Sequence, residues 1–246
     1  MKIVVIGGTG LIGSKLVARL GEHGHQAVPA APNTGVNSLT GEGVEEVLQD
    51  ANVVIDVSNS PSFADNDVME FFRTSTTNLL AAAAAAGVGH YVALSVVGSE
   101  RLPDSGYLRA KVAQEELIEG SGLPYSIVRA TQFFEFAGGI ADSATVDGQV
   151  RLPGSSMQPM AADDVAAAVG RTAAGEPKNG TIEVGGPEVI ALDEWIRTVL
   201  STRSEPRTVV TDPEARYFGA VPQRELLPGS DAQLAQTRLS EWLTSN

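Results

Sequence analysis

The sequence predicts an α/β fold in which helices cover both faces of a doubly wound parallel sheet. From the first residue to about residue 130, short apolar segments rich in β-branched residues alternate with amphipathic segments. This alternation is typical of parallel sheets built with right-handed crossovers. A glycine-rich turn lies between the first apolar segment and the first amphipathic one. After residue 130 the alternation ends, which predicts a small C-terminal lobe added to the sheet.

The first element is a buried strand, Lys2–Ile6, followed by a glycine turn and an amphipathic helix near residues 11–20. Backbone N–H groups at the start of such a helix are unpaired and lie at the positive end of the helix dipole, which predicts an anion site. Gly7 suits the turn conformation, Gly10 lets a diphosphate approach, and Gly13 lets the helix pack closely. The Lys-Ser/Thr pair of nucleoside-triphosphate loops is missing. A glycine turn with a packing role only is the alternative.

The same criteria predict the other elements of the first half. Strands are expected at Gln26–Ala30, Asn52–Val57, His90–Ser95 and Tyr125–Arg129, with a very short one around Val36–Leu39, and helices at Val44–Gln49, Asp65–Ala86 and Tyr107–Glu119. The loop SNSPSF follows the strand that ends near residue 57. Ligands of open α/β sheets bind at the carboxyl ends of strands, so this loop is a candidate ligand contact.

The second half is less regular. Its expected elements are a helix-like aromatic stretch at Phe133, Phe134 and Phe136, a hairpin at Thr145–Leu152 turning at Asp147-Gly148, a helix Val165–Ala174 capped by Asp163 or Asp164, a strand Thr181–Val184, and helices near Leu192–Leu200 and Asp231–Leu243 that cover the ligand crevice. We expect residues 1–246 to form a single domain, in which 1–130 make a dinucleotide-binding core and 131–246 a substrate-binding lobe plus the last sheet strand.

Composition limits the partners. The formal net charge is −13, which argues against nucleic acid or an anionic membrane surface, because both need a basic face. A polyanionic cofactor is still compatible, since local backbone dipoles would hold it. Cysteine is absent and the three histidines lack a carboxylate pattern, so no metal site is expected. With no leader-like or long apolar segment, we expect a cytoplasmic monomer or homodimer that acts on a small molecule.

Three residues are expected to meet at the strand ends: Ser95, Tyr107 and Lys111. A tyrosine and a lysine four residues apart share one face of a helix. A lysine ammonium there would lower the tyrosine pKa from about 10 toward neutrality, and the serine hydroxyl could orient a carbonyl for protonation. This is the equipment of a carbonyl reductase. Taken alone, the Tyr-x-x-x-Lys spacing more often marks a surface pair.

Several segments together resemble a known family. They are GGTGLIG (7–13), YLRAK (107–111), GLPYSIVRATQFF (122–134), ADDVAAAV (162–169) and TIEVGGPEVIALDEW (181–195). The chain resembles the short-chain dehydrogenase/reductase superfamily, in its atypical branch with NmrA-like proteins, and so the NAD(P)-binding Rossmann fold. The resemblance implies a nicotinamide dinucleotide along the strand ends and hydride transfer with Tyr107 as acid/base. It also implies that Lys111 holds the nicotinamide ribose.

Together, the strand-end positions and the resemblance lead us to expect two sets of contact residues. The cofactor set comprises Gly7, Thr9, Gly10, Leu11, Ile12, Gly13, Asn33, Thr34, Asn37, Ser58, Asn59, Lys111 and Ala130. The substrate set comprises Ser60, Gln132, Phe133 and Phe134, although such phenylalanines are more often core residues.

The segment after the second strand departs from the family pattern. NAD-dependent relatives have an acidic residue there for the ribose hydroxyls, whereas this chain has Ala30-Ala31-Pro32-Asn33-Thr34, without an NADP-type arginine. We therefore expect NADP(H) as cofactor, with NAD(H) possible and Asn33 and Thr34 near the extra phosphate. Asn37 stands where relatives have an adenine-contacting aspartate. Asn78 is expected to be structural rather than catalytic.

The sequence as a whole predicts an NADP-preferring reductase of a ketone, quinone or enone in a small, moderately apolar molecule, of which a secondary-metabolite ketoreductase is one example. Two alternatives are an NmrA-like dinucleotide-binding regulator without turnover and an epimerase or isomerase that uses the cofactor transiently. The complete set of Ser95, Tyr107 and Lys111 favours the enzyme, because a pure sensor has no need to keep it.

Overall fold

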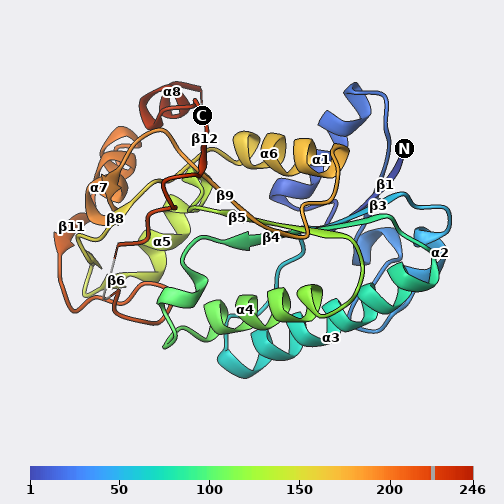
Figure 1. The fold of residues 1–246 in the computed structure, drawn as a ribbon. Helices are drawn as coiled ribbons and strands as arrows, with labels where there is room; N and C mark the ends of the chain where they lie inside the picture. The colour runs from blue at the N-terminus through green and yellow to red at the C-terminus, as the bar shows by residue number, and fades with distance from the viewer. Residues whose placement is uncertain (223–224, 246) are drawn as a thin grey trace.

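A seven-stranded parallel sheet forms the centre of the protein in a computed structural model that describes residues 1–222 and 225–245 (Figure 1). The strand order is β12-β9-β5-β4-β3-β1-β2, and every neighbouring pair is parallel. The strands are β1 (Lys2–Ile6), β2 (Gln26–Ala30), β3 (Val53–Asp56), β4 (His90–Val96), β5 (Tyr125–Ala130), β9 (Gly180–Gly185) and β12 (Gln233–Leu234). The predicted doubly wound parallel sheet is confirmed.

Helices cover both faces of this sheet (Figure 1). On one face lie α1 (Leu11–Glu22) and α6 (Ala162–Ala174), and on the other α2 (Val44–Leu48), α3 (Asp65–Ala85) and α4 (Gly106–Glu119). Successive side chains of a strand point to opposite faces, so Ile3 and Val5 pack with α1 and α6 whereas Val4 and Ile6 pack with α2 and α3. Both faces of β1 are therefore buried, which explains its continuous apolar sequence.

The remaining elements form a second core at the C-terminal side. They are α5 (Ala137–Ser143), β6 (Thr145–Val146), β7 (Gln149–Leu152), β8 (Ser156–Met157), β10 (Ile190–Ala191), α7 (Leu192–Thr202), β11 (Thr208–Thr211) and α8 (Leu239–Ser245), with short 3-10 turns at Pro32–Thr34, Ser99–Arg101 and Phe134–Phe136. Trp195 and Trp242 lie in this core. The predicted hairpin is present as β6 and β7, and Asp147 and Gly148 both have the positive φ that a two-residue turn needs.

Three local predictions are wrong. Residues 36–39 form no strand, because Asn37 Oδ1 accepts a hydrogen bond from the Leu39 amide and closes a turn. The stretch 231–243 is not one helix: β12 pairs with β9, and α8 begins only at Leu239, whose amide donates to Glu188. Neither Asp163 nor Asp164 is the N-cap of α6. The cap position is Ala161, and Glu135 accepts from the Ala162 amide.

Among the described residues, none of the helices has the length and apolar character needed to cross a lipid bilayer.

The start of α1 packs against the glycine turn at very short range. A Cβ added to Gly13 would lie 2.1 Å from the Gly7 carbonyl oxygen, so a side chain there forces the helix away from the turn. Gly7 itself has φ +78°, a conformation that L side chains rarely adopt. By contrast, Gly21 near the end of α1 has open space around it.

We predict that Gly13→Ala lowers the free energy of unfolding by about 2 to 3 kcal/mol, because the overpacked turn has to move. The matched control is Gly21→Ala in the same helix, which should raise the free energy of unfolding by up to about 1 kcal/mol through higher helix propensity. Urea unfolding followed by circular dichroism measures both. Equal effects of the two substitutions would contradict the close contact between α1 and the turn.

Candidate active site

The backbone at the start of α1 is accessible beside the glycine turn. Its N-cap is Gly10, and no described side chain caps the helix. Cβ atoms on Gly7, Gly8 or Gly13 would meet backbone atoms within 3 Å, so the fold itself requires these glycines. A Cβ on Gly10 would meet only the Gly7 carbonyl oxygen, at 3.3 Å. The space beside Gly10 therefore fits a ligand group that approaches the backbone, as a diphosphate does at a helix N-terminus.

The turn after β2 brings Asn33 to the same rim as the glycine turn, because Thr9 Oγ1 donates to Asn33 Oδ1 at 3.1 Å. Thr34 also stabilises this turn. Its hydroxyl accepts from the Ala31 amide and donates to the Ala31 carbonyl, both at 2.9 Å. Thr34 is exposed, and its contact with the extra phosphate stays a prediction.

Asn37 and Asn78 both stabilise the loop that follows. Besides the Leu39 amide, at 3.0 Å, Asn37 Oδ1 accepts weakly from the Thr40 amide, at 3.4 Å. Asn78 Nδ2 donates to the carbonyls of Ser38 and Leu39, which confirms its predicted structural role. The oxygen of Asn37 is therefore already engaged on the protein side.

A buried carboxyl group at the end of β3 organises the next loop. Asp56 is 1% exposed, and its Oδ1 accepts from the amide and the hydroxyl of Ser58 at 3.0 and 2.6 Å. Its Oδ2 accepts from Gln114 Nε2 at 3.0 Å and from the Tyr91 hydroxyl at 3.3 Å. The loop after β3 is thereby tied to α4 and to β4.

The residue after Ser58 in this loop receives the Tyr107 hydroxyl. Asn59 Oδ1 accepts from Tyr107 at 3.1 Å and from the Ser60 amide at 3.0 Å. Tyr107 lies in the first turn of α4, whose N-cap Ser105 accepts from the Leu108 amide. Burial raises the pKa of Tyr107 above its usual value of about 10. The phenol is therefore neutral at pH 7 and acts as a hydrogen-bond donor.

Lys111 is 3% exposed and points between α4 and β4. Its Nζ donates to the Leu94 carbonyl at 2.9 Å and to Gln114 Oε1, and lies 4.3 Å from the centre of the Phe72 ring. Burial lowers the pKa of Lys111 to about 8, although the charges of Asp56 and Glu115 oppose this shift. Gln114 thus bridges the ammonium and the Asp56 carboxyl group.

The expectation that Lys111 lowers the pKa of Tyr107 is wrong. Both residues lie on α4 and both contact the Phe72 ring, but the lysine ammonium donates to Leu94 and Gln114. The pKa of Tyr107 rises, and burial is the cause. The two side chains therefore have different hydrogen-bond partners.

In the described part of the chain, two buried polar atoms near the carboxyl ends of β4 and β5 lack partners. Ser95 Oγ and Gln132 Oε1 have no hydrogen-bond partner within residues 1–222 and 225–245. An unpaired buried polar group costs on the order of 1 to 3 kcal/mol. The carboxyl ends of parallel strands are where open α/β sheets bind ligands, so these two atoms fit groups that a bound ligand completes.

The predicted substrate residues do not all reach this region. Phe134 is 1% exposed and packs against Trp195 and Trp242, with ring centres 6.3 and 5.4 Å away, which corrects its assignment to the substrate site. Phe133 stacks on Phe136 at 5.2 Å. Ser60 is buried and its hydroxyl accepts from the Ser62 amide. Three residues of the predicted cofactor set differ in exposure: Ala130 is buried at the end of β5, Leu11 is exposed, and Ile12 is buried in the first turn of α1.

Aromatic residues that the sequence did not single out surround Tyr107. Phe218 stacks on its ring with centres 5.3 Å apart, Phe63 lies at 5.6 Å, and Phe72 meets it edge-on at 6.0 Å. Phe63 belongs to the loop after β3, Phe72 to α3, and Phe218 to the segment after β11. A Phe-Gly pair within RYFGAV is a weak turn signal, but nothing local indicates that this turn reaches α4.

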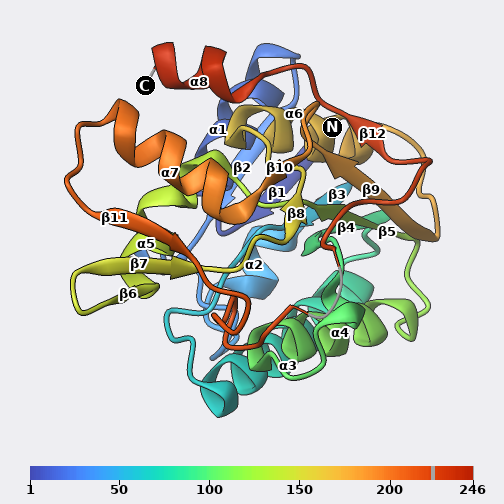
Figure 2. The ribbon, with the colours of Figure 1, turned by 90° about the vertical axis from the view of Figure 1, so that its left-hand side faces the viewer.

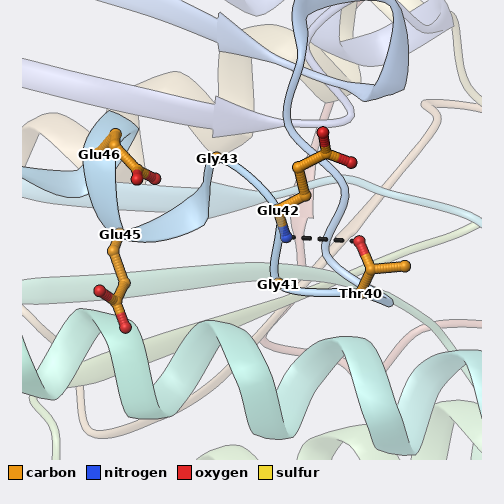
Figure 3. A pocket seen from close by; sticks show the side chains of 6 residues that line it. All are labelled: Thr40, Gly41, Glu42, Gly43, Glu45 and Glu46. Carbon is orange, nitrogen blue, oxygen red and sulfur yellow. Dashed lines mark hydrogen bonds between the residues drawn. The ribbon is translucent and has the colours of Figure 1, made fainter.

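A hollow of about 540 Å³ lies away from these residues, lined by Thr40, Gly41, Glu42, Gly43, Glu45 and Glu46 (Figure 3). Its three carboxylates point in different directions in Figure 3. Over the described part of the chain, no group of three or more histidines and carboxylates is arranged to hold a metal ion. The negative charge also makes this hollow unsuitable for the phosphates of a dinucleotide.

Known proteins similar to this chain include a reductase and an assembly factor. It is 28% identical over 211 residues to (4-alkanoyl-5-oxo-2,5-dihydrofuran-3-yl)methyl phosphate reductase of Streptomyces griseus, covering 78% of this chain and 70% of that protein. It is 28% identical over 165 residues to photosystem II assembly factor Ycf39 of Cyanophora paradoxa, covering 59% of this chain and 51% of the relative. The chain therefore spans about half of the length of Ycf39.

A solved structure, MoeE5 in complex with UDP-glucuronic acid and NAD, superposes with a TM-score of 0.79 at 19% identity, covering 100% of this chain and 97% of that one. This likeness shows the Rossmann-type fold. Residues 7–174, well over half of the chain, match the family described as NAD(P)H-binding. The glycine turn, the ends of β4 and β5 and Tyr107 all lie within the matched range. The chain belongs to the NAD(P)H-binding family, in agreement with its resemblance to atypical short-chain dehydrogenases/reductases.

Proposed function

We propose that this protein is an NADP(H)-preferring oxidoreductase that reduces a ketone, quinone or enone in a small, moderately apolar molecule. The observation that carries the proposal is the neutral Tyr107 phenol, held by Asn59 at the carboxyl end of the sheet. A neutral phenol can donate a proton to an oxygen that gains negative charge during reduction. The similarity to a protein named a reductase supports the same reaction class.

A nicotinamide dinucleotide, when bound, would supply the hydride. In the proposed reaction the carbonyl carbon gains a C–H bond and its π electron pair moves onto oxygen. Tyr107 then gives that oxygen its proton and regains one from solvent. Asn59 holds the Tyr107 hydroxyl in position before the substrate oxygen takes over as the acceptor. Ser95 Oγ, unpartnered within the described residues, supports a second hydrogen bond to the substrate.

Two parts of the proposed site would bind different parts of the dinucleotide. Gly10 and the uncapped start of α1 would hold the diphosphate. Lys111, which already donates to Leu94 and Gln114, would use its third N–H to hold the nicotinamide ribose, and it offsets the charge of Asp56 through Gln114. The pKa of Lys111 is lowered only to about 8, which is still above 7, so the lysine is protonated at pH 7.

A second candidate function is a dinucleotide-binding regulator without turnover. The similarity to an assembly factor favours it. The two candidates differ in one observable, because only the reductase oxidises NADPH when a carbonyl substrate is present. A panel of quinones, cyclic enones and aromatic ketones tests this directly. Tight NADPH binding with no turnover on any panel member would favour the regulator.

We predict that NADPH binds about tenfold more tightly than NADH, a difference of about 1.4 kcal/mol. The segment 30–34 after β2 has no carboxylate to bind the ribose hydroxyls of NADH or to repel the extra phosphate of NADPH. The preference should be modest because an arginine clamp for that phosphate is also missing from the segment. Fluorescence titration with both cofactors measures the ratio. Tighter binding of NADH would contradict the proposal.

We predict that Tyr107→Phe lowers turnover by about 10² to 10⁴ on a confirmed substrate while NADPH affinity changes little. The hydroxyl acts on the substrate oxygen only as charge develops there, so its loss affects the transition state. Tyr125→Phe is the matched control, because Tyr125 begins β5 at the opposite end of the sheet. Steady-state kinetics and cofactor titration separate the two effects. Near wild-type turnover of Tyr107→Phe would remove Tyr107 as the proton donor.

We predict that NADPH affinity falls as the pH rises from about 7 to about 9. Lys111 has a pKa lowered to about 8, so it is charged at the lower end of this range and neutral at the upper end. Loss of the ammonium removes its attraction for the ribose oxygens. Lys111→Met should bind NADPH more weakly at pH 7 and show no such fall. The same pH dependence in both proteins would show that another group titrates.

A further inference from the structure

The turn that carries Phe218 has an unusual backbone for its sequence. Tyr217 and Ala220 exchange two hydrogen bonds, from the Tyr217 amide at 2.7 Å and from the Ala220 amide at 3.1 Å. Between them, Phe218 has φ +49° and Gly219 has φ +80°. Positive φ at both central positions is typical of a type I′ turn, which favours Asn-Gly. Phenylalanine at the first position is strained, and such strain is often found at functional sites.

This strained turn places the Phe218 ring on the candidate proton donor. The rings of Phe218 and Tyr107 are nearly parallel, at 7°, with centres 5.3 Å apart. Figure 2 shows how the segment after β11 extends from the C-terminal lobe to α3 and α4. Tyr217 stabilises the turn, because the centre of its ring lies 4.5 Å from that of Phe218 and its side chain is hydrogen-bonded to Gln132.

Phe63, Phe72, Tyr107 and Phe218 together form what we call the aromatic box. Four separate segments supply these rings, and three of them contact the Tyr107 ring. Phe63 is 63% exposed, although it lies beside the candidate proton donor. Large exposed aromatic side chains beside a polar reacting group are suited to ligand binding.

Within residues 1–222 and 225–245, the cations near the aromatic box already have partners. Lys111 donates to Leu94 and Gln114, and the proposed function assigns its third N–H to the nicotinamide ribose. Arg109 binds Asp65 and the Pro103 carbonyl. Arg216 donates to the Gly219 carbonyl within the turn itself. The surfaces that the box offers to a ligand are therefore ring faces and edges, which bind other flat π systems by offset stacking or edge contacts.

We infer that the aromatic box selects a flat, conjugated ring carbonyl compound, such as a bicyclic quinone, and that Phe218 is the specificity-determining residue. This inference rests on the proposed function for the reaction but not for the binding. Phe218 and Phe63 hold the substrate ring, and the ring carbonyl replaces Asn59 as the acceptor of the Tyr107 hydroxyl. Hydride addition to the ring carbonyl carbon and protonation of its oxygen by Tyr107 would give a hydroxy-dienone, which tautomerises to the hydroquinone. Overall, quinone, NADPH and one proton would give hydroquinone and NADP⁺.

The test uses two variants of Phe218 that separate the ring from the backbone. Phe218→Asn removes the ring and creates Asn-Gly, which suits a type I′ turn, so the thermal midpoint should be unchanged or higher. Phe218→Tyr keeps an aromatic ring at this position and should bind the probes as the wild type does. Phe136→Ala is the control for general loss of an exposed aromatic, because Phe136 stacks on Phe133 outside the aromatic box.

Binding is measured by calorimetry with NADP⁺-saturated protein, which cannot reduce the ligand. The probes are 1,4-naphthoquinone, which is flat, and 1-decalone, a saturated ketone of similar size. We expect Phe218→Asn to weaken naphthoquinone binding about tenfold and to leave decalone binding within about twofold. Equal weakening of both probes, unchanged naphthoquinone binding, or no naphthoquinone binding to the wild type would each overturn the inference.

Turnover with NADPH distinguishes this inference from the proposed function. If naphthoquinone binding depends on Phe218 and the wild type also oxidises NADPH with it, both are supported. If the binding depends on Phe218 but NADPH is not oxidised, the ring site stands and the reductase proposal fails for this substrate class. If naphthoquinone is reduced with equal KM by wild type and Phe218→Asn, the reductase proposal stands and the role of Phe218 is refuted.

Discussion

A single buried carboxyl group, that of Asp56, holds together the parts from which the candidate site is built. It binds Ser58 in the loop after β3, Gln114 on α4 and Tyr91 on β4. The position of Asn59, and with it the hydrogen bond of the Tyr107 hydroxyl, follows from this anchor. Removing one partner of a buried charged network usually costs more than an exposed contact, because the remaining groups lose both water and partner. The site therefore depends on an interaction that never touches the substrate.

Burial shifts the pKa values of Tyr107 and Lys111 in opposite directions, and in both cases it favours the neutral form. It raises the pKa of the Tyr107 phenol and lowers that of the Lys111 ammonium, because a low-dielectric interior disfavours the charged form of either group. Tyr107 consequently keeps its proton at neutral pH and has little nucleophilic or basic character. The pKa of Lys111 lies about one unit above neutral pH, and the charges of Asp56 and Glu115 oppose its further lowering.

The sequence predicted the features that local patterns determine. The glycine turn, the parallel strands and the hairpin were all recognisable from spacing and turn residues. The failures have non-local causes. Helical spacing put Lys111 on the same side of α4 as Tyr107, but Gln114 and a strand carbonyl set the direction of its side chain. The apolar character of Phe134 could not distinguish core from pocket. Phe218 reaches its partner from more than a hundred residues away, and residues 233–234 became a strand because β9 offered an open edge.

Proline in β2 affects how one copy of this protein can meet another. The Gln26 amide donates inward to Met1, and alternate residues of a strand point to the same side. Pro29 therefore stands where an amide hydrogen would otherwise face outward from the open edge of the sheet. At the other edge, β12 is only two residues long. Unprotected edges recruit strands from other molecules, and short strands and prolines are the usual defences. The sheet is thus blunted at both ends against fibril-like growth, even though its interior strands are strongly apolar.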